Sequence, residues 1–209
     1  MDINTLIKNN SNLIVVLIIM QLISGCDLEL QEDFDYVGNP IEIPTSDLTV
    51  YEYVKSNPDS IFDHLSLAIE YTGMKSHFES SERTYFLLPD YTWEGSGGII
   101  AALGGTTVED IPVDKLKKLL LYHTIDEWVD QETLPTISTE YFYQTMLEGD
   151  HGIMVIEREE IRFRLDINDS RSVPDGTLST RVDRHNYRFS NGVAHLLRNF
   201  LRYGEKAYD

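Results

Sequence analysis

The sequence predicts a single α+β domain that follows an N-terminal targeting segment. Apolar residues recur at helical spacing between residues 49 and 122, whereas from Leu134 onward they alternate with polar ones, as in strands. Helices and strands that are segregated in this way favour an α+β fold over a doubly wound parallel sheet. The 209 residues, 42% of them hydrophobic, are enough for one core.

The chain is strongly acidic, with a formal net charge of −18 at pH 7. Such a charge repels the phosphate backbone of DNA and RNA, so we expect no nucleic-acid partner. Twelve Tyr, eight Phe and two Trp are more aromatic side chains than a disordered chain carries. Most of the chain is therefore expected to fold, as a monomeric domain.

Residues 1–25 have the features of a secretion signal. Lys8 precedes an apolar run of eleven residues, 13–23. This length suits the apolar core of a signal peptide and is well short of the ~20 residues that a membrane-spanning helix needs. We therefore expect a cleaved signal peptide rather than a transmembrane anchor.

The end of this run resembles the lipobox of bacterial lipoproteins. Ser24 and Gly25 are small enough to let a lipoprotein signal peptidase reach the backbone, and Cys26 supplies the thiol that is acylated. Cys26 is the only cysteine, so an internal disulfide is excluded. We expect palmitate-type acyl chains on Cys26 to hold the protein on a membrane. The alternative is a chance cysteine beside an uncleaved apolar segment.

Residues 26–47 are expected to form an acidic tether. Acidic residues recur between Asp27 and Glu42 without a basic one, and Pro40 and Pro44 oppose a helix. A stretch of this kind resembles the surface-export signal of Bacteroidetes lipoproteins, which implies a place on the outer membrane and exposure at the cell surface. A solvated linker that keeps the domain away from anionic lipid explains the composition equally well.

Three helices are expected in the first half of the domain, which begins near Thr49. Thr49 and Glu52 have the spacing of a capping box, so a short helix should run through Val54. A second helix is expected over 57–72, before a glycine, and a third over 113–122. The residues expected to face the core from the second and third helices are Phe62, Leu65, Ile69, Leu116, Leu119 and Leu120.

Strands are expected where β-branched, aromatic and alternating residues form short runs. These runs are 84–88, 153–156, 161–165, 187–189 and 193–201. Before the last of them, Asn191 and Gly192 suggest a turn that requires a positive φ. The glycine-rich segment 95–105 is expected to be a flexible loop, because its GSGG lacks the Lys-Ser/Thr ending of a phosphate loop.

Three short sequence motifs, which we call boxes, follow one another along the domain. They are a Thr-x-Phe strand entering an acidic turn, a Leu-x-Tyr-His segment at a helix end, and an Asn-Gly-Val-x-His strand. They are carried by Thr84, Phe86, Asp90, Tyr122, His123, Asn191, Gly192 and His195. Together they resemble the fasciclin (FAS1) domain family over residues 48–203, which leaves 204–209 as a C-terminal tail. The chain departs from the family pattern at Pro89, one position late, at Arg198, where an Asp is usual, and in a longer stretch at 168–183.

This resemblance implies a wedge of two β-sheets with helices packed on one side. It also implies cell adhesion or ligand binding, without catalysis. His123, at the end of a helix, can donate to carbonyls that the helix leaves without partners. We interpret it as a structural histidine, with a contact to a partner molecule as the alternative.

Neither a catalytic nor a metal-binding motif stands out in the sequence. The six histidines are spread singly, without a pair at ligand spacing. The segment 166–177 begins like a calcium loop, but Arg171 replaces its turn glycine and Thr177 its terminal Glu. The sequence therefore predicts a non-catalytic binding module with no cofactor and no metal. The alternative is an accessory component or enzyme of a surface polysaccharide-uptake system, because an acidic chain offers many carboxylate pairs.

The charge of the chain is unevenly distributed, since nine of the ten arginines lie after residue 157. Strand alternation is expected to turn Arg162, Arg164 and Arg188 outward. Arginine beside tyrosine on a flat sheet suits carboxylated or sulfated glycans and acidic protein surfaces, so these three are the candidate partner-binding residues. Pairing with neighbouring acids is the alternative. The acids expected within reach are Glu157, Glu159 and Asp183.

Overall fold

The computed structural model describes residues 45–57, 60–135, 139–159 and 164–208. The predicted signal peptide, Cys26, most of the predicted tether and Arg162 lie outside these ranges. The chain divides into residues 1–42 and 43–209, and every described residue belongs to the second unit. None of the helices in the described ranges has the length and apolar character that crossing a bilayer requires.

The first helices follow local signals in the sequence. Helix α2, Val50–Ser56, begins with the predicted capping box: the Thr49 hydroxyl accepts the Glu52 N–H, and the Glu52 carboxylate accepts the Thr49 N–H. Helix α3, Asp63–Thr72, ends at Gly73, whose φ of 69° is left-handed. The glycine stop predicted for the second helix is therefore confirmed.

Helix α3 begins later than the sequence predicts. Asn57 takes a left-handed conformation, with φ 43°, and ends α2. Its Oδ1 accepts the N–H groups of Ile61 and Phe62, a use of asparagine that is common in turns. The residue expected to open the second helix therefore closes the first one and shapes the connection between them.

Helix α6, Val113–Tyr122, has the predicted bounds. The other short helices are α4 (Lys75–Phe78), η1 (Asp90–Thr92), α5 (Ile99–Ala102) and η2 (Asp150–Gly152). All six apolar residues predicted to face inward from the second and third helices are buried. The 3.6-residue period therefore identified the correct face of both helices.

The described strands form one seven-stranded sheet. In sheet order they are β2 (Thr124–Ile125), β1 (Arg83–Leu87), β7 (Gly192–Leu197), β6 (Thr180–Phe189), β5 (Leu165–Ile167), β4 (Ile153–Arg158) and β3 (Glu140–Gln144). Strands β1 and β7 pair in parallel, and the other neighbours pair antiparallel. Strands β2 and β3 have no counterpart among the runs expected from the sequence.

The two ends of this sheet approach each other. Ile125 beside β1 forms an isolated bridge with Thr145 at the end of β3, and the Met146 N–H donates to the Thr124 carbonyl at 2.8 Å. Strand β6 carries two register shifts, which bend the sheet in its middle. The sheet is therefore nearly closed on itself.

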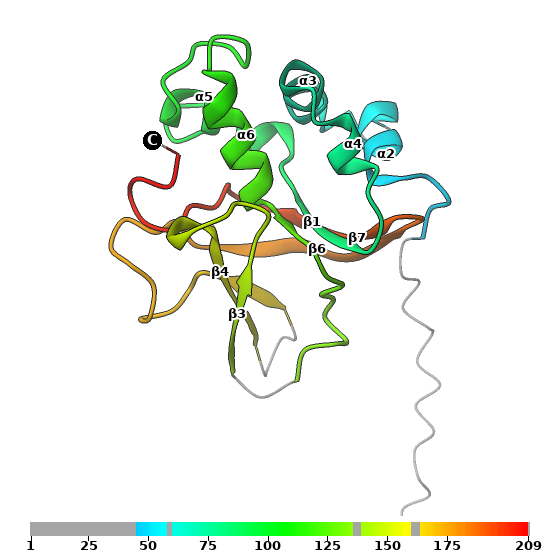
Figure 1. The fold of residues 1–209 in the computed structure, drawn as a ribbon, viewed down its shortest axis with the longest axis vertical. Helices are drawn as coiled ribbons and strands as arrows, with labels where there is room; N and C mark the ends of the chain where they lie inside the picture. Colours follow the sequence, from blue (N-terminus) through cyan, green and yellow to red (C-terminus); the bar gives the residue numbers. More distant parts are fainter. Residues whose placement is uncertain (1–44, 58–59, 136–138, 160–163, 209) are drawn as a thin grey trace, which may run out of the picture. The chain divides into compact units, whose positions relative to one another are not determined.

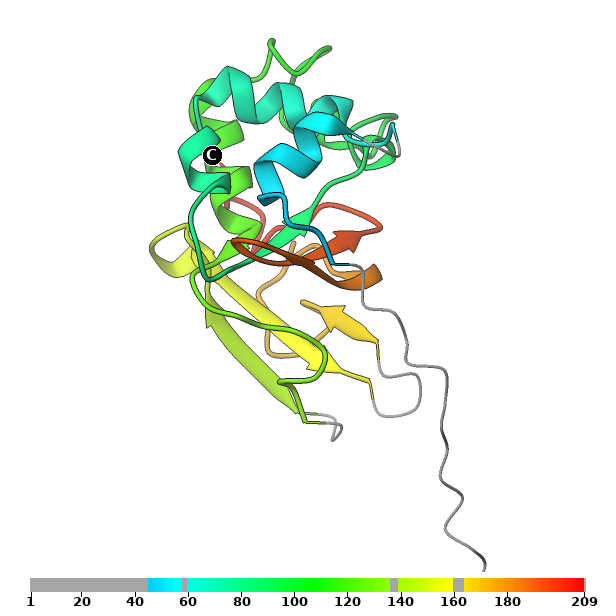
Figure 2. The ribbon, with the colours of Figure 1, turned by 90° about the vertical axis from the view of Figure 1, so that its right-hand side faces the viewer.

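Strand β6 divides the sheet into two halves, β2–β1–β7–β6 and β6–β5–β4–β3. Figures 1 and 2 show the helices on one side of the first half and strands β3 and β4 on its other side. Both faces of β7 are therefore covered, and all six of its residues are buried. The predicted α+β fold with helices on one side is confirmed, and the two halves of one bent sheet take the place of the two sheets expected.

The domain extends beyond both of its expected ends. Ser46 N–H donates to the Arg188 carbonyl at 2.8 Å, so the pairing with β6 begins inside the stretch expected to be tether. At the other end Tyr208 is only 4% exposed, its ring contacts that of Tyr122, and its hydroxyl donates to the Leu201 carbonyl. The residues expected to form a C-terminal tail thus complete the core up to Tyr208.

Candidate functional site

The residues of the first box lie inside the domain. The Thr84 hydroxyl donates to the Glu127 carbonyl at 2.7 Å and accepts the Val129 N–H at 2.8 Å. This ties β1 to the segment that follows β2. Phe86 is 2% exposed and stacks on the His195 ring at 5.5 Å. Thr84 and Phe86 therefore stabilise the sheet from within.

His195 is a satisfied core histidine. Its Nε2 donates to the Val129 carbonyl at 2.9 Å, and its Nδ1 accepts the Asn186 N–H at 3.3 Å. This pattern needs the neutral ring, which has one donor and one acceptor. Burial lowers the pKa of His195 to about 4, so the ring is neutral at physiological pH.

Tyr122 and His123 end helix α6 and are also buried. His123 Nδ1 donates to the Leu119 carbonyl at 2.8 Å, and its Nε2 accepts the Leu201 N–H at 3.0 Å. Burial lowers the pKa of His123 to about 4. The Tyr122 hydroxyl donates to the Ile153 carbonyl at 2.9 Å, and burial raises its pKa. These contacts support the interpretation of His123 as a structural histidine.

Asn191 joins three segments. Its Oδ1 accepts the Val50 N–H at 2.9 Å, and its Nδ2 donates to the carbonyls of Phe78 and Ser80, each at 2.9 Å. Gly192 follows the turn with a positive φ of 158°, and a Cβ there would lie 2.2 Å from the Arg83 carbonyl. The positive φ predicted at this turn is therefore present, and the close approach of β1 is a second reason for glycine.

Asp90 caps helix α3 from outside the helix. Its carboxylate accepts the N–H groups of His64, at 2.9 Å, and Asp63, at 3.2 Å. It also accepts the Nδ1–H of His64 at 3.1 Å. A carboxylate here favours the helix N-terminus electrostatically. All eight residues of the boxes therefore have structural roles that explain why they occur together.

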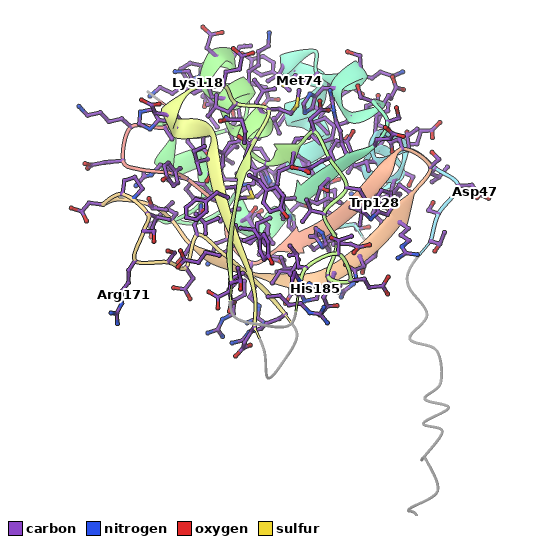
Figure 3. All side chains as sticks on the ribbon, turned by 60° about the horizontal axis from the view of Figure 1, so that its bottom comes forward. Asp47, Met74, Lys118, Trp128, Arg171 and His185 are labelled. Atoms are coloured by element: carbon purple, nitrogen blue, oxygen red, sulfur yellow. The ribbon has the colours of Figure 1, made fainter. Side chains whose placement is uncertain are left out.

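The two candidate arginines that the structure describes are engaged within the domain. Arg164 Nε lies 2.6 Å from the Glu159 carboxylate, and its side chain is 20% exposed. Arg188 Nη2 lies 3.0 Å from Glu132 and 3.5 Å from Asp130. These contacts favour the alternative of pairing with acids. Figure 3 shows by contrast Arg171, at the lower left of the view, pointing away from the domain.

A different surface combines an exposed aromatic ring with polar groups. One hollow of about 400 Å³ is lined by Tyr91, Asp183, Arg198 and Asn199. A neighbouring hollow of about 260 Å³ is lined by Asp169, Ser179, Thr180, Arg181, Arg198 and Asn199. Arg198 and Asn199 line both, so the two hollows adjoin at these residues. We call this surface the Tyr91–Arg198 groove.

Tyr91 provides a fixed apolar surface in this groove. The residue is 53% exposed, while its hydroxyl donates to the Leu197 carbonyl at 2.9 Å. The hydrogen bond holds the ring in place without covering it. Partial burial raises the pKa of Tyr91, so the hydroxyl stays protonated.

Two arginines flank the second hollow, Arg181 on β6 and Arg198 directly after β7. The Arg198 N–H donates to the Arg181 carbonyl at 3.5 Å, so the two residues lie opposite each other. Asp183 lies 2.9 Å from the Nε of Arg198, and Asp166 lies 3.4 Å from the Nε of Arg181. Within the described ranges, the terminal Nη groups of both arginines have no partner and are available as donors.

The charged side chains that line the groove balance. They are two acids, Asp169 and Asp183, and two arginines, Arg181 and Arg198. The groove therefore offers hydrogen-bond donors and acceptors without a net charge of its own. No three His, Cys, Asp or Glu side chains among the described residues are grouped as a metal site requires.

Sequence reasoning did not find this groove. Tyr91 follows Asp90, whereas Asp183 and Arg198 lie on or after strands that reach it only through the fold. One signal was present: Arg198 stands where the family pattern has an Asp, so a departure from the pattern marks the groove.

Comparison with known proteins supports the fold. No protein-family model matches the sequence, and no characterised protein matches it. Among solved structures, a match is a FAS1 domain pair from the insect cell adhesion molecule fasciclin I, with a TM-score of 0.56 and 18% sequence identity. The match covers 78% of this chain and 53% of that chain, so this chain spans about half of the domain pair.

Proposed function

We propose that this chain, which has a FAS1-like fold, is a lipid-anchored, non-catalytic adhesion module that binds a neutral glycan in the Tyr91–Arg198 groove. The observation that carries the proposal is the exposed Tyr91 ring, held by its hydroxyl beside an ion-paired arginine. The occurrence of the same fold in an insect cell adhesion molecule agrees with a binding role.

The groove suits a sugar for three physical reasons. A tyrosine ring gives a large rigid contact surface at a low cost in side-chain entropy, and it can pack against the C–H face of a sugar ring. Arg198 and Asn199 donate hydrogen bonds, and Asp183 accepts them, as sugar hydroxyls require. Pockets that bind small molecules combine apolar walls with a few polar groups of this kind.

A neutral ligand fits better than the acidic glycan or acidic protein surface that the arginine-rich sequence suggested. The arginines in the groove are paired with carboxylates, and the lining charges cancel. The whole chain carries a charge of −18, which repels a polyanion at long range.

The decisive measurement is a glycan array probed with the purified chain and two variants. Tyr91→Ala should lower binding to the retained glycan about tenfold, because truncating a central aromatic contact costs roughly 1–2 kcal/mol. Tyr71→Ala is the matched control, since Tyr71 is an exposed tyrosine of α3, 41% accessible, outside the groove. Equal losses of glycan binding in both variants would contradict binding in the Tyr91–Arg198 groove.

Salt separates the ligand classes. Binding of a neutral glycan should change little between low and high salt, whereas binding of an acidic glycan should weaken strongly, because salt screens charge–charge attraction. Retention of sulfated or uronate-containing glycans alone, with strong salt dependence, would replace the neutral ligand by an acidic one.

Membrane attachment through Cys26 is part of the proposal and rests on the sequence of residues 13–26. The acidic stretch after Cys26 supports a place on the outer membrane, as in Bacteroidetes-type surface lipoproteins. Cys26→Ala should abolish metabolic labelling with a palmitate analogue, because the chain has no other thiol. Ser24→Ala keeps a small residue before the cysteine and should leave labelling intact. Persistent labelling of Cys26→Ala would refute the lipid anchor.

A further inference from the structure

A second hollow lies apart from the Tyr91–Arg198 groove, between the beginning of α3 and the glycine-rich segment 95–105. It encloses about 470 Å³. Its lining residues are His64, Trp93, Glu94, Gly95, Ile100, Ala101, Gly105 and Thr106. We call it the His64–Glu94 cleft.

The cleft has a defined shape because its walls are hydrogen-bonded. The N–H of Ile100 donates to the Trp93 carbonyl at 3.2 Å, and the N–H of Gly105 donates to the Ile100 carbonyl at 2.9 Å. A Cβ on Gly98 would lie 2.3 Å from the Glu94 carbonyl, so the turn depends on glycine. The segment expected to be a flexible loop is thus a compact turn around α5.

His64 lines the cleft with a ring that is held in place. Its Nδ1 lies 3.1 Å from the Asp90 carboxylate, and with the Nδ1–H donated to that oxygen the acceptor nitrogen of the ring is Nε2. The ring is stacked against Trp93, with centroids 6.2 Å apart and 16° between the planes. In the described part of the chain, His64 Nε2 has no hydrogen-bond partner. The orientation of this acceptor is therefore fixed before any ligand arrives.

The other polar side chains of the cleft also accept hydrogen bonds. The Thr106 hydroxyl gives its only hydrogen to the Asp110 carboxylate, so its oxygen offers lone pairs. This contact comes first among those that lower the pKa of Asp110, which therefore stays ionised. Glu94 is an exposed carboxylate that forms no ion pair or hydrogen bond with the described residues. The polar side chains of the cleft thus offer hydrogen-bond acceptors.

The charges around the cleft have one sign. Glu94 lines it, and Asp90 and Asp110 stand directly behind His64 and Thr106. Neither lysine nor arginine is found among the described residues that line it. Ile100 and Ala101 supply apolar surface. A ligand that fits has several N–H donors, a positive charge and an apolar stem.

We propose that the His64–Glu94 cleft binds an alkylammonium group, as carried by a small amine or by the lysine side chain of a partner. Glu94 neutralises the ammonium, and His64 Nε2 and the Thr106 oxygen accept two of its three hydrogens. The stem packs against Ile100 and Ala101. This site is independent of the Tyr91–Arg198 groove and of any glycan.

The first test is titration of the purified chain with n-butylammonium chloride, followed by amide NMR shifts. Saturable shifts should be confined to the amides of Gly95, Ala101 and Gly105 and their neighbours. The neutral matched compound, n-butanol, should bind at least about tenfold more weakly, since hydrogen bonds to charged groups are worth roughly 1.5–3 kcal/mol. Equal binding of the two compounds, or no saturable shift, would overturn the proposal.

Substitutions then test whether Glu94 supplies the negative charge that binds n-butylammonium. Glu94→Gln should weaken n-butylammonium binding about fivefold or more, with an unchanged melting temperature because the side chain is exposed. Glu109→Gln is the matched control: it removes the same charge from a nearby exposed position that does not line the cleft. Equal weakening by both variants would mean a diffuse charge effect and would refute the site.

A short peptide distinguishes the two sources of the ammonium. If N-acetyl-Gly-Lys-Gly-amide binds as well as n-butylammonium and loses affinity when its lysine is acetylated, the cleft takes a lysine of a partner protein. If n-butylammonium alone binds, the ligand is a small free amine. Binding of the acetylated peptide as tightly as the lysine peptide would contradict recognition of the charge.

Discussion

Lowering the pH from 7 to 5 should remove much of the free energy of unfolding of this domain. Burial lowers the pKa values of His123 and His195 to about 4, whereas an exposed histidine in the unfolded chain titrates near 6.5. The unfolded chain therefore takes up protons first as the pH falls. Stability declines through pH 6.5, and the loss is complete only below about pH 4.

The size of the effect follows from these values. Between pH 7 and 5 each of the two fully buried rings should cost about 2 kcal/mol, or about 4 kcal/mol together. His77, whose pKa burial also lowers to about 4, adds to the loss with the same sign. A total of this size is a large part of the roughly 5–15 kcal/mol by which domains are stable.

Urea unfolding at pH 7, 6 and 5 measures this dependence. The slope of unfolding free energy against pH should fall in His195→Gln and in His123→Gln, because each variant lacks one histidine that takes up a proton when the chain unfolds. His151→Gln is the control for the substitution itself, since His151 is exposed and lies outside the core. Equal unfolding free energies of the unsubstituted chain at pH 7 and 5 would refute the reasoning.

Three further predictions concern stability. Phe86→Ala and Leu197→Ala should each lower the unfolding free energy by about 3 kcal/mol in urea, because both side chains are buried; losses below about 0.5 kcal/mol would contradict their place in the core. Replacing Arg164 and Arg188 together by Ser should lower the melting temperature but leave glycan binding of the folded chain unchanged; weaker binding at an unchanged melting temperature would restore them as partner-binding residues. Tyr208→Ala should lower the melting temperature by several degrees in a thermal melt, and no shift would mean that residues after 203 are a tail.

The parts of the fold that the sequence predicted are those with strong local signals. The Thr49–Glu52 capping box and the periodic Leu residues of α6 depend on neighbours three or four positions away, so they can be recognised without the fold. Strand β2 has only two residues and was missed, because no alternation exists over so short a length. The start of α3 was placed too early because Asn57 serves two turns at once.

The candidate sites were harder to predict for a related reason. The pairing of Arg164 with Glu159 connects residues close in the sequence, and Glu159 was among the acids expected within reach. The partners of Arg188, Glu132 and Asp130, come from a distant loop and were not expected. Surfaces such as the Tyr91–Arg198 groove depend on which strands become neighbours, and residue patterns along the chain do not encode that information directly.

The parallel pairing of β1 with β7 also constrains how the domain can form. Arg83 pairs with Gly192 and Leu87 with Leu196. The first strand of the domain therefore cannot complete its pairing until the last strand is present. Contacts between such distant segments slow folding, because a long loop must close before they are made. During synthesis β1 would remain without this neighbour until β7 has emerged. Until then, the edge of β1 that faces β7 has unpaired backbone groups and is open to pairing with strands of other chains.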